Sequence, residues 1–330
     1  MDYIIGSFNL YKLNLESNEN VKKNYSRIAE IIDKENFDVI ALQEITSKMA
    51  LERLLMPELG TNEWDYAWQQ PKPYSSYNEG YAYIWRKRRL KLVESASNPK
   101  ILENYPILRP PYYARFTPEG LIGGSNFELR LINIHIAFGK PAGFYYIDTS
   151  ENLRKFELNI LAKDIYRRVS AKRYGNNLPA YTIALGDYNL CLAGPGPKIP
   201  EIISIEKNRD FLTVQREKTT VKTPKSVKQP LDDVGHPIDI MQESDTDFYS
   251  RNYDHFSYEL TLLDKLELLD SRVDTLKNHY GNNLVEYRKE VSDHVPIKLV
   301  LSLIHKEQSL NKEKMYRDSS FYFGRDEYYD

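Results

Sequence analysis

The sequence predicts an α/β fold, and three observations support this prediction. Short apolar stretches that suit β-strands alternate along the chain with stretches whose apolar residues recur at helical spacing. Several of the strand-like stretches are almost continuously apolar, which is typical of strands buried on both faces of a sheet that helices cover. Polar residues stand at the ends of these strands, where rigid elements can hold a functional site.

Six stretches have the apolar composition of buried strands. They are residues 4–8, 38–42, 81–85, 129–136, 181–185 and 296–304. Two further stretches are expected to be amphipathic helices. One is residues 22–35, and the other is residues 150–171, where an apolar stripe follows a Thr149 or Ser150 cap. Strands and helices that alternate in this way indicate sheets covered by helices.

One domain is expected to span residues 1–304, because no internal repeat and no clear linker divides the 330 residues. Residues 194–236 are rich in Pro, Gly, Lys and Asp, and we expect a long loop insertion there, with at most a short hairpin. Residues 305–330 are charged and tyrosine-rich without a clear period, and are expected to be a tail. The insertion and the tail are the candidate contacts for a protein partner.

The composition bounds the class of protein. The formal net charge of −2 argues against a protein that only coats DNA, which would be strongly basic. The single cysteine, Cys191, cannot form an intrachain disulfide, which suits a reducing compartment. The first residues lack the features of a signal peptide, and no apolar run approaches the roughly 18 residues of a membrane span. We therefore expect a cytoplasmic protein without a membrane segment.

Polar residues that could form a metal site stand at the ends of several predicted strands. They are Asn9, Glu44, Asp187, Asn189, Asp293 and His294. Carboxylate and carboxamide oxygens are hard ligands that suit Mg²⁺, Mn²⁺ or Ca²⁺. The sequence has no His-Glu-x-x-His motif and no cysteine pair, which disfavours a zinc hydrolase. It also has no Gly-x-x-x-x-Gly-Lys-Ser/Thr loop, which disfavours a P-loop NTPase.

Short motifs lie in a fixed order along the chain. They are Ser7-Phe8-Asn9, Ala41-Leu42-Gln43-Glu44, Asn78-Glu79-Gly80-Tyr81-Ala82, Arg109-Pro110-Pro111 followed by Arg115-Phe116, Asn133-Ile134-His135, Gly186-Asp187-Tyr188-Asn189, Tyr253-Asp254 and Ser292-Asp293-His294. In this combination they resemble the endonuclease/exonuclease/phosphatase superfamily, and its deoxyribonuclease-I-like group most closely. The resemblance implies a four-layer α/β/β/α sandwich, in which two packed mixed β-sheets are flanked by helices.

The resemblance also implies a metal site. Glu44 would be the principal ligand, helped by Asn9 and Asp293. The expected cofactor is Mg²⁺, with Mn²⁺ or Ca²⁺ as alternatives. The cation would offset charge on the scissile phosphate and orient it.

Two histidine–carboxylate pairs complete the implied catalytic set. Glu79 would hold His135, and Asp254 would hold His294, because a carboxylate behind an imidazole fixes its tautomer. One histidine would help activate water and the other would stabilise or protonate the leaving oxygen, and the sequence leaves open which does which.

Four further roles follow from the same resemblance. Asp187 would orient the attacking water, and Asn189 would donate to a phosphate oxygen. Arg115 matches an arginine near the phosphate backbone, and its fork suits phosphate geometry. Tyr77 would touch the sugar or the minor groove.

The chain departs from its relatives at two positions. Tyr11 stands where abasic-site repair enzymes carry an acid two residues after the asparagine, which weakens a repair function. Thr46 stands where the deoxyribonuclease-I-like group commonly has an arginine, so a minor-groove contact is in doubt.

The function expected from the sequence is metal-dependent hydrolysis of a phosphodiester in nucleic acid, by a DNA endonuclease with little sequence specificity. Two alternatives stay open: a phosphatase or phospholipase of the same superfamily that acts on a small phosphorylated or lipid substrate, and a catalytically silent binding module. The sequence does not decide between DNA and RNA, or between single and double strands.

Overall fold

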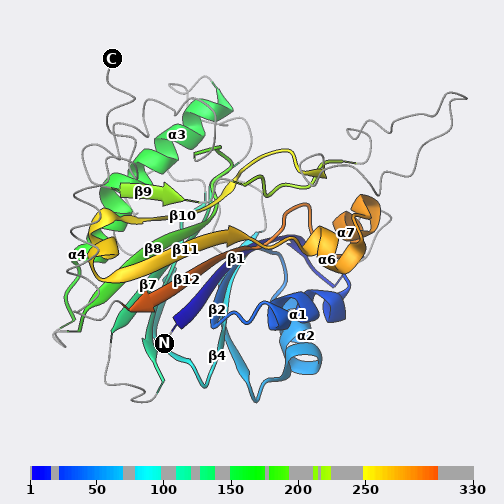
Figure 1. Ribbon diagram of the computed structural model, residues 1–330, viewed down its shortest axis with the longest axis horizontal. Helices are drawn as coiled ribbons and strands as arrows, with labels where there is room; N and C mark the ends of the chain where they lie inside the picture. The colour runs from blue at the N-terminus through cyan, green and yellow to red at the C-terminus, as the bar shows by residue number, and fades with distance from the viewer. Residues whose placement is uncertain are drawn as a thin grey trace, which may run out of the picture.

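Two six-stranded β-sheets lie face to face, with helices against both outer faces (Figure 1). The computed structural model describes residues 2–15, 22–69, 79–97, 109–119, 127–137, 149–174, 178–192, 211–214, 217–223 and 248–303. One hydrophobic core lies between the sheets, and a further core lies under the helices on each outer face. The predicted four-layer α/β/β/α sandwich is therefore confirmed.

The first sheet has the strand order β11-β12-β1-β2-β4-β3. Its strands are β1 (Asp2–Leu13), β2 (Val39–Ile45), β3 (Trp64–Gln69), β4 (Gly80–Arg86), β11 (Leu266–Arg272) and β12 (Ile297–Leu303). Only β1 and β2 are parallel, and the other neighbours pair antiparallel. The helices on its outer face are α1 (Tyr25–Lys34), α2 (Lys48–Arg53), the π-helix η1 (Leu54–Gly60), α6 (Thr275–Tyr280) and α7 (Leu284–Glu290).

The second sheet has the same plan, in the order β5-β6-β7-β8-β10-β9. Its strands are β5 (Leu90–Ser97), β6 (Tyr112–Pro118), β7 (Glu128–His135), β8 (Ala180–Asp187), β9 (Phe211–Val214) and β10 (Asp254–Glu259). Again only the central pair, β7 and β8, is parallel. Its outer face is covered by α3 (Ser150–Ile160), the π-helix η3 (Leu161–Tyr166) and α4 (Arg167–Ala171).

Strand alternation decides which side chains of β7 face the other sheet. Leu129 and Leu131 belong to the core between the sheets, whereas Ile132 and Ile134 pack against the helices of the outer face. His135 follows the register of Leu131 and so points to the inner side, where the two sheets meet.

The six predicted strands are all present, and both predicted helices are present with changed bounds. The first strand runs from Asp2 to Leu13, because β1 continues through an irregularity after Asn9. The helix expected over 150–171 is interrupted by η3, and Thr149 caps its start by accepting from the Asn152 N–H at 3.1 Å. In the described part of the chain, no helix has the length and apolar character needed to cross a membrane.

The region expected to be a loop insertion, 194–236, contributes to the fold where it is described. Its strand β9 pairs with β10 and extends the second sheet. Thr220 forms an isolated bridge with His294. The sequence predicted a long loop insertion with at most a short hairpin, whereas these described residues add a strand to the edge of the second sheet and a bridge to His294. The tail 305–330 and most of the insertion lie outside the described residues.

Candidate active site

The predicted site residues of the two sheets meet at the carboxyl ends of the two parallel strand pairs. Asn9 lies in β1 and Glu44 in β2, while His135 and Asp187 end β7 and β8. The Asn9 Nδ2 group donates to Glu44 Oε1 and to Asp187 Oδ2, both at 3.1 Å. A single amide group thus joins a carboxylate of the first sheet to a carboxylate of the second.

Irregular backbone in the first sheet directs Glu44 into the site. Glu44 has a positive φ of 58°, and in β1 Tyr11 and Lys12 have φ values of 43° and 56°. Left-handed backbone at residues other than glycine costs on the order of 1 kcal/mol or more each, and such strain persists where the surroundings fix it. Here the Lys12 N–H donates to Glu44 Oε2 at 3.1 Å, and the Tyr11 N–H donates to Asn9 Oδ1 at 2.9 Å. The bulge in β1 therefore holds both side chains in place.

Gly186 allows β8 to approach β7 closely beside the site. Its φ is +145°, and a Cβ atom at this position would lie 1.9 Å from the carbonyl oxygen of Ile134. No other residue fits without moving the strand. The close approach places Asp187 opposite His135 in the register of the two strands.

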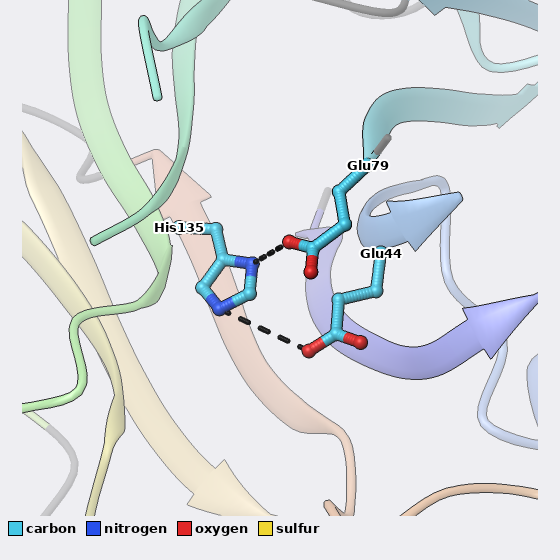
Figure 2. Close-up of side chains that lie close together, drawn as sticks. All are labelled: Glu44, Glu79 and His135. Atoms are coloured by element: carbon cyan, nitrogen blue, oxygen red, sulfur yellow. Dashed lines mark ion pairs between the residues drawn. The ribbon is translucent and has the colours of Figure 1, made fainter. Parts of the chain in front are cut away.

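His135 lies between three carboxylates. Its Nδ1 atom is 3.4 Å from Glu79 Oε2, and its Nε2 atom is 3.5 Å from Asp187 Oδ2 and 3.9 Å from Glu44 Oε1. Figure 2 shows the two ring nitrogens of His135 facing the carboxylates of Glu79 and Glu44. Burial and, to a smaller extent, the nearby Arg109 guanidinium lower the pKa of His135 to about 4, against the attraction of Asp187 and Glu44. His135 is therefore neutral at pH 7.

His294 is held differently. Its Nδ1 atom is 2.7 Å from Asp254 Oδ2, and its Nε2 atom is 3.6 Å from Asp187 Oδ2. Burial opposes the charged form, but Asp254 and Asp187 outweigh it and keep the pKa of His294 well above its ordinary value. Asp254 is itself fixed by Thr219, whose hydroxyl donates to Oδ2 at 2.5 Å. The structure thus gives a tightly hydrogen-bonded imidazolium on this side of Asp187.

Asn189 shapes the site from the loop after β8. It has a positive φ of 50°. Its backbone N–H donates to Asp187 Oδ1, and its Nδ2 group donates to the carbonyl oxygen of Ile136, both at 2.8 Å. One of its two amide hydrogens is therefore committed to the backbone, which leaves one for the donation to a phosphate that was predicted.

The acidic residues fit a divalent cation. Glu44, Glu79 and His135 each offer a ligand atom, and these atoms lie within 4.8 Å of one another. Burial raises the pKa of Glu44, and the Glu79 and Asp293 carboxylates add to this effect while His135 opposes it. The Oδ1 atom of Asp293 is buried without a hydrogen-bond partner. Crowded carboxylates of this kind are stabilised by a cation.

Asn9, predicted as a metal ligand, lies beside Glu44. Its Nδ2 group donates to Glu44 and Asp187, and its oxygen accepts from the Tyr11 N–H. Since only the oxygen can bind Mg²⁺, the predicted role as a ligand requires the amide to turn, and in the present arrangement its N–H group positions Glu44.

Arg115 is not brought into the site. It lies opposite Arg130 in the β6–β7 pairing. Arg130 precedes His135 by five residues, so Arg115 is about 16 Å from His135 along the strand direction. This register places it on the helix-covered face, where its guanidinium contacts Glu128 at 2.8 Å and the Tyr174 ring. The expected phosphate contact is therefore not supported. Tyr77, the other predicted substrate contact, lies outside the described residues.

Arg109, which belongs to the same sequence motif as Arg115, does reach the site. Its Nη2 atom is 2.9 Å from Glu79 Oε2. Ser292 was also missed: its hydroxyl donates to the carbonyl oxygen of Asn9 at 2.6 Å and accepts from the His294 N–H at 3.0 Å. Both residues stand in motifs of the sequence, which was the available signal. Thr219 carried no such signal, because it lies in the presumed insertion.

Comparison with known proteins identifies the family. A family model described as the Endonuclease/Exonuclease/phosphatase family matches residues 6–294. The chain belongs to this family. As a member of the Endonuclease/Exonuclease/phosphatase family and of its deoxyribonuclease-I-like superfamily, it is a hydrolase. A search of curated proteins finds no match to the sequence.

Solved structures share the family fold at low sequence identity. TDP2 from D. rerio, humanized by 14 mutations, is 14% identical with a TM-score of 0.54, and the match covers 91% of this chain and 99% of that one. The human nocturnin catalytic domain is 15% identical with a TM-score of 0.52, covering 92% and 94%. A mannosyl-6-phosphatase from Bacteroides thetaiotaomicron is 15% identical with a TM-score of 0.51, covering 92% and 100%. At such identities the likeness shows the fold alone.

Proposed function

We propose that this protein is a divalent-metal-dependent phosphodiesterase that cuts nucleic acid, in particular DNA, with little sequence preference. One observation carries the proposal. The Nε2 atoms of His135 and His294 lie 3.5 and 3.6 Å from the same oxygen, Asp187 Oδ2, which also accepts a hydrogen bond from Asn9. Two imidazoles backed by carboxylates around a central acid suit attack by water on a phosphate and departure of an alkoxide.

The residues divide the work by their surroundings. Asp187 is buried, and burial raises its pKa while His294 and His135 oppose this effect. In the proposed mechanism Asp187 orients the attacking water and accepts its proton. His294, with Nδ1 fixed by Asp254, directs Nε2–H into the site, where it can donate to a phosphate oxygen or to the leaving oxygen. Neutral His135 lies between Asp187 and the carboxylates of Glu44 and Glu79, where it provides a second imidazole that can contact the substrate.

Glu44 and Asp293 would hold the metal, with Glu79 and His135 close by. A divalent cation there supplies charge compensation for the phosphate and orients it. Mg²⁺ is the proposed ion, with Mn²⁺ and Ca²⁺ as alternatives, because the ligands are oxygens. Arg109 contacts Glu79 at 2.9 Å and Arg288 contacts Asp293 at 3.5 Å, whereas Glu44 has no lysine or arginine side chain within ion-pair distance among the described residues, which supports a metal next to Glu44.

The choice of nucleic acid rests on the resemblance of the motifs, and on a structural relative. D. rerio TDP2, at 14% identity, has been solved in complex with a single-strand DNA product. The mannosyl-6-phosphatase shares the fold to a similar degree, so a small phosphate ester is the second candidate substrate. We keep the cytoplasmic location as a prediction from the single exposed cysteine.

A substrate panel tests the proposal. Purified protein with Mg²⁺ or Mn²⁺ would be assayed on plasmid DNA, single-stranded DNA, RNA and phosphomonoesters, with and without EDTA. We expect cleavage of DNA that EDTA abolishes and that Glu44→Gln lowers by at least about 10²-fold. His279→Ala is a matched control, since His279 also has a carboxylate neighbour, Glu30 at 3.9 Å, away from this site. Faster turnover of a phosphomonoester than of any polynucleotide would replace the proposed substrate.

A further inference from the structure

Lys23 places an ammonium group between two segments that carry site residues. It lies just before α1, and its Nζ atom donates to the carbonyl oxygen of Val291 at 2.6 Å. The same atom lies 5.4 Å from the centroid of the Tyr11 ring. Tyr11 follows Asn9 by two residues, and Val291 precedes Asp293 by two. Lys23 therefore contacts the two segments that carry Asn9 and Asp293.

The charge of Lys23 is poorly compensated. The residue is partly buried, and burial lowers the pKa of its ammonium to about 7 against the attraction of Asp293 and Glu44. Among the described residues, no carboxylate lies within ion-pair distance of its Nζ atom. A desolvated cation is costly unless an anion meets it. Its neighbour Lys22 is exposed, and the Lys22 N–H donates to the carbonyl oxygen of Lys289 at 2.9 Å.

A metal in the site makes this arrangement less favourable. A divalent cation held by Glu44 and Asp293 would take up the acids that attract Lys23, and would also repel the ammonium. A phosphate group bound to the metal would bring negative charge to the same place. Once the metal is bound, Lys23 is compensated only when phosphate is bound as well.

We propose that Lys23 is a substrate-binding residue that meets a phosphate oxygen of the substrate and makes metal binding and phosphate binding depend on each other. The inference rests on the proposed function, since it assumes a metal at Glu44 and a phosphate ester as substrate. Without phosphate, Lys23 weakens metal binding by repulsion. With phosphate bound, it favours the ternary state, and by linkage the metal tightens phosphate binding by the same factor.

The test is a binding experiment on the full-length protein that needs no turnover. Mn²⁺ affinity would be measured by electron paramagnetic resonance, with and without inorganic phosphate, for the wild type, Lys23→Met and Lys22→Met. We expect Lys23→Met to bind Mn²⁺ about tenfold more tightly without phosphate. Phosphate should tighten Mn²⁺ binding several-fold in the wild type and in Lys22→Met, and much less in Lys23→Met.

Further variants separate charge from folding. Lys23→Arg retains the charge and should keep the coupling. Lys23→Gln keeps a hydrogen-bond donor for Val291 but should lose the coupling between Mn²⁺ and phosphate. It provides a second neutral variant if Lys23→Met unfolds. With substrate, neutral variants should raise KM more than they lower kcat. Equal Mn²⁺ affinity and an equal phosphate effect in the wild type and both neutral variants would overturn the inference.

The outcome is distinguishable from failure of the proposed function. If the wild type couples Mn²⁺ to phosphate but cleaves no polynucleotide, the role of Lys23 stands and the substrate changes. If it cleaves DNA without such coupling, the function stands and the inference about Lys23 is overturned.

Discussion

The two histidines that we propose to be catalytic have the same kind of partner but opposite surroundings. His294 is 2.7 Å from Asp254, and the carboxylates around it keep its pKa well above the ordinary value. His135 is 3.4 Å from Glu79, which Arg109 also contacts, and burial lowers the pKa of His135 to about 4. Both imidazoles nevertheless reach one oxygen of Asp187.

The difference shows that a histidine–carboxylate pair does not fix a role by itself. The charge of the carboxylate's second partner also matters. Asp254 accepts a hydrogen bond from the neutral hydroxyl of Thr219, whereas Glu79 is paired with the positively charged guanidinium of Arg109. Arg109 therefore weakens the pull of Glu79 on His135. Groups whose pKa values are pushed apart in this way are suited to separate acid and base roles.

Removal of the shared centre should have the largest effect. Asp187→Ala takes away the group that both imidazoles and Asn9 address, so we expect kcat to fall by about 10³-fold or more. Steady-state kinetics on DNA would measure the loss, with His279→Ala as a control. A fall of less than about tenfold would mean that the two histidines do not act through one centre.

The two carboxylate partners should differ in importance. Asp254→Asn removes a charge-assisted hydrogen bond that fixes the His294 tautomer, and should lower kcat by about 10²-fold or more. Glu79→Gln removes a longer and already compensated contact, and should cost about tenfold. Parallel kcat measurements on both variants decide the comparison. Equal losses would make the two pairs equivalent.

The pH dependence of stability should separate the histidines in the metal-free protein. The raised pKa of His294 means that its stabilising charge is present below the unfolded pKa of about 6.5 and is lost as pH rises through the folded value. The lowered pKa of His135 has the opposite sign: stability is present above about 6.5 and is lost as pH falls towards 4. The free energy of unfolding would be measured by urea unfolding in EDTA at a series of pH values for the wild type, His294→Gln and His135→Gln. His294→Gln should remove the loss of stability at high pH, and His135→Gln should remove the loss at low pH.

Arg109 gives the smallest and most specific test. Arg109→Met removes the positive charge next to Glu79, so the pKa of His135 should rise from about 4 while His294 changes little. NMR titration of the imidazoles in the metal-free protein would measure both values. A shift confined to His294 would show that Arg109 does not set the difference between the two pairs.

Six of the twelve described strands and most of the site could be predicted because their signals are local. Apolar runs marked six strands, and the short motifs marked Glu44, His135, Asp187 and His294. The resemblance predicts Arg115 at the phosphate, but a motif match does not tell which face of a strand a side chain takes, and Arg109 is the arginine that contacts Glu79. The role of Thr219 was not predictable, because its partner Asp254 is 35 residues away and the intervening chain resembles a loop.

The sequence by itself determined six of the strands, two of the helices and the chemical types available for a site, since these depend on residue periodicity and composition. Tertiary structure decided which atoms meet. The hydrogen bond from Asn9 to Asp187 spans 178 positions, and it exists because two sheets pack with the carboxyl ends of their parallel strands together. The charge state of each histidine was decided there too, because burial and the neighbouring charges come from segments that are distant in the chain.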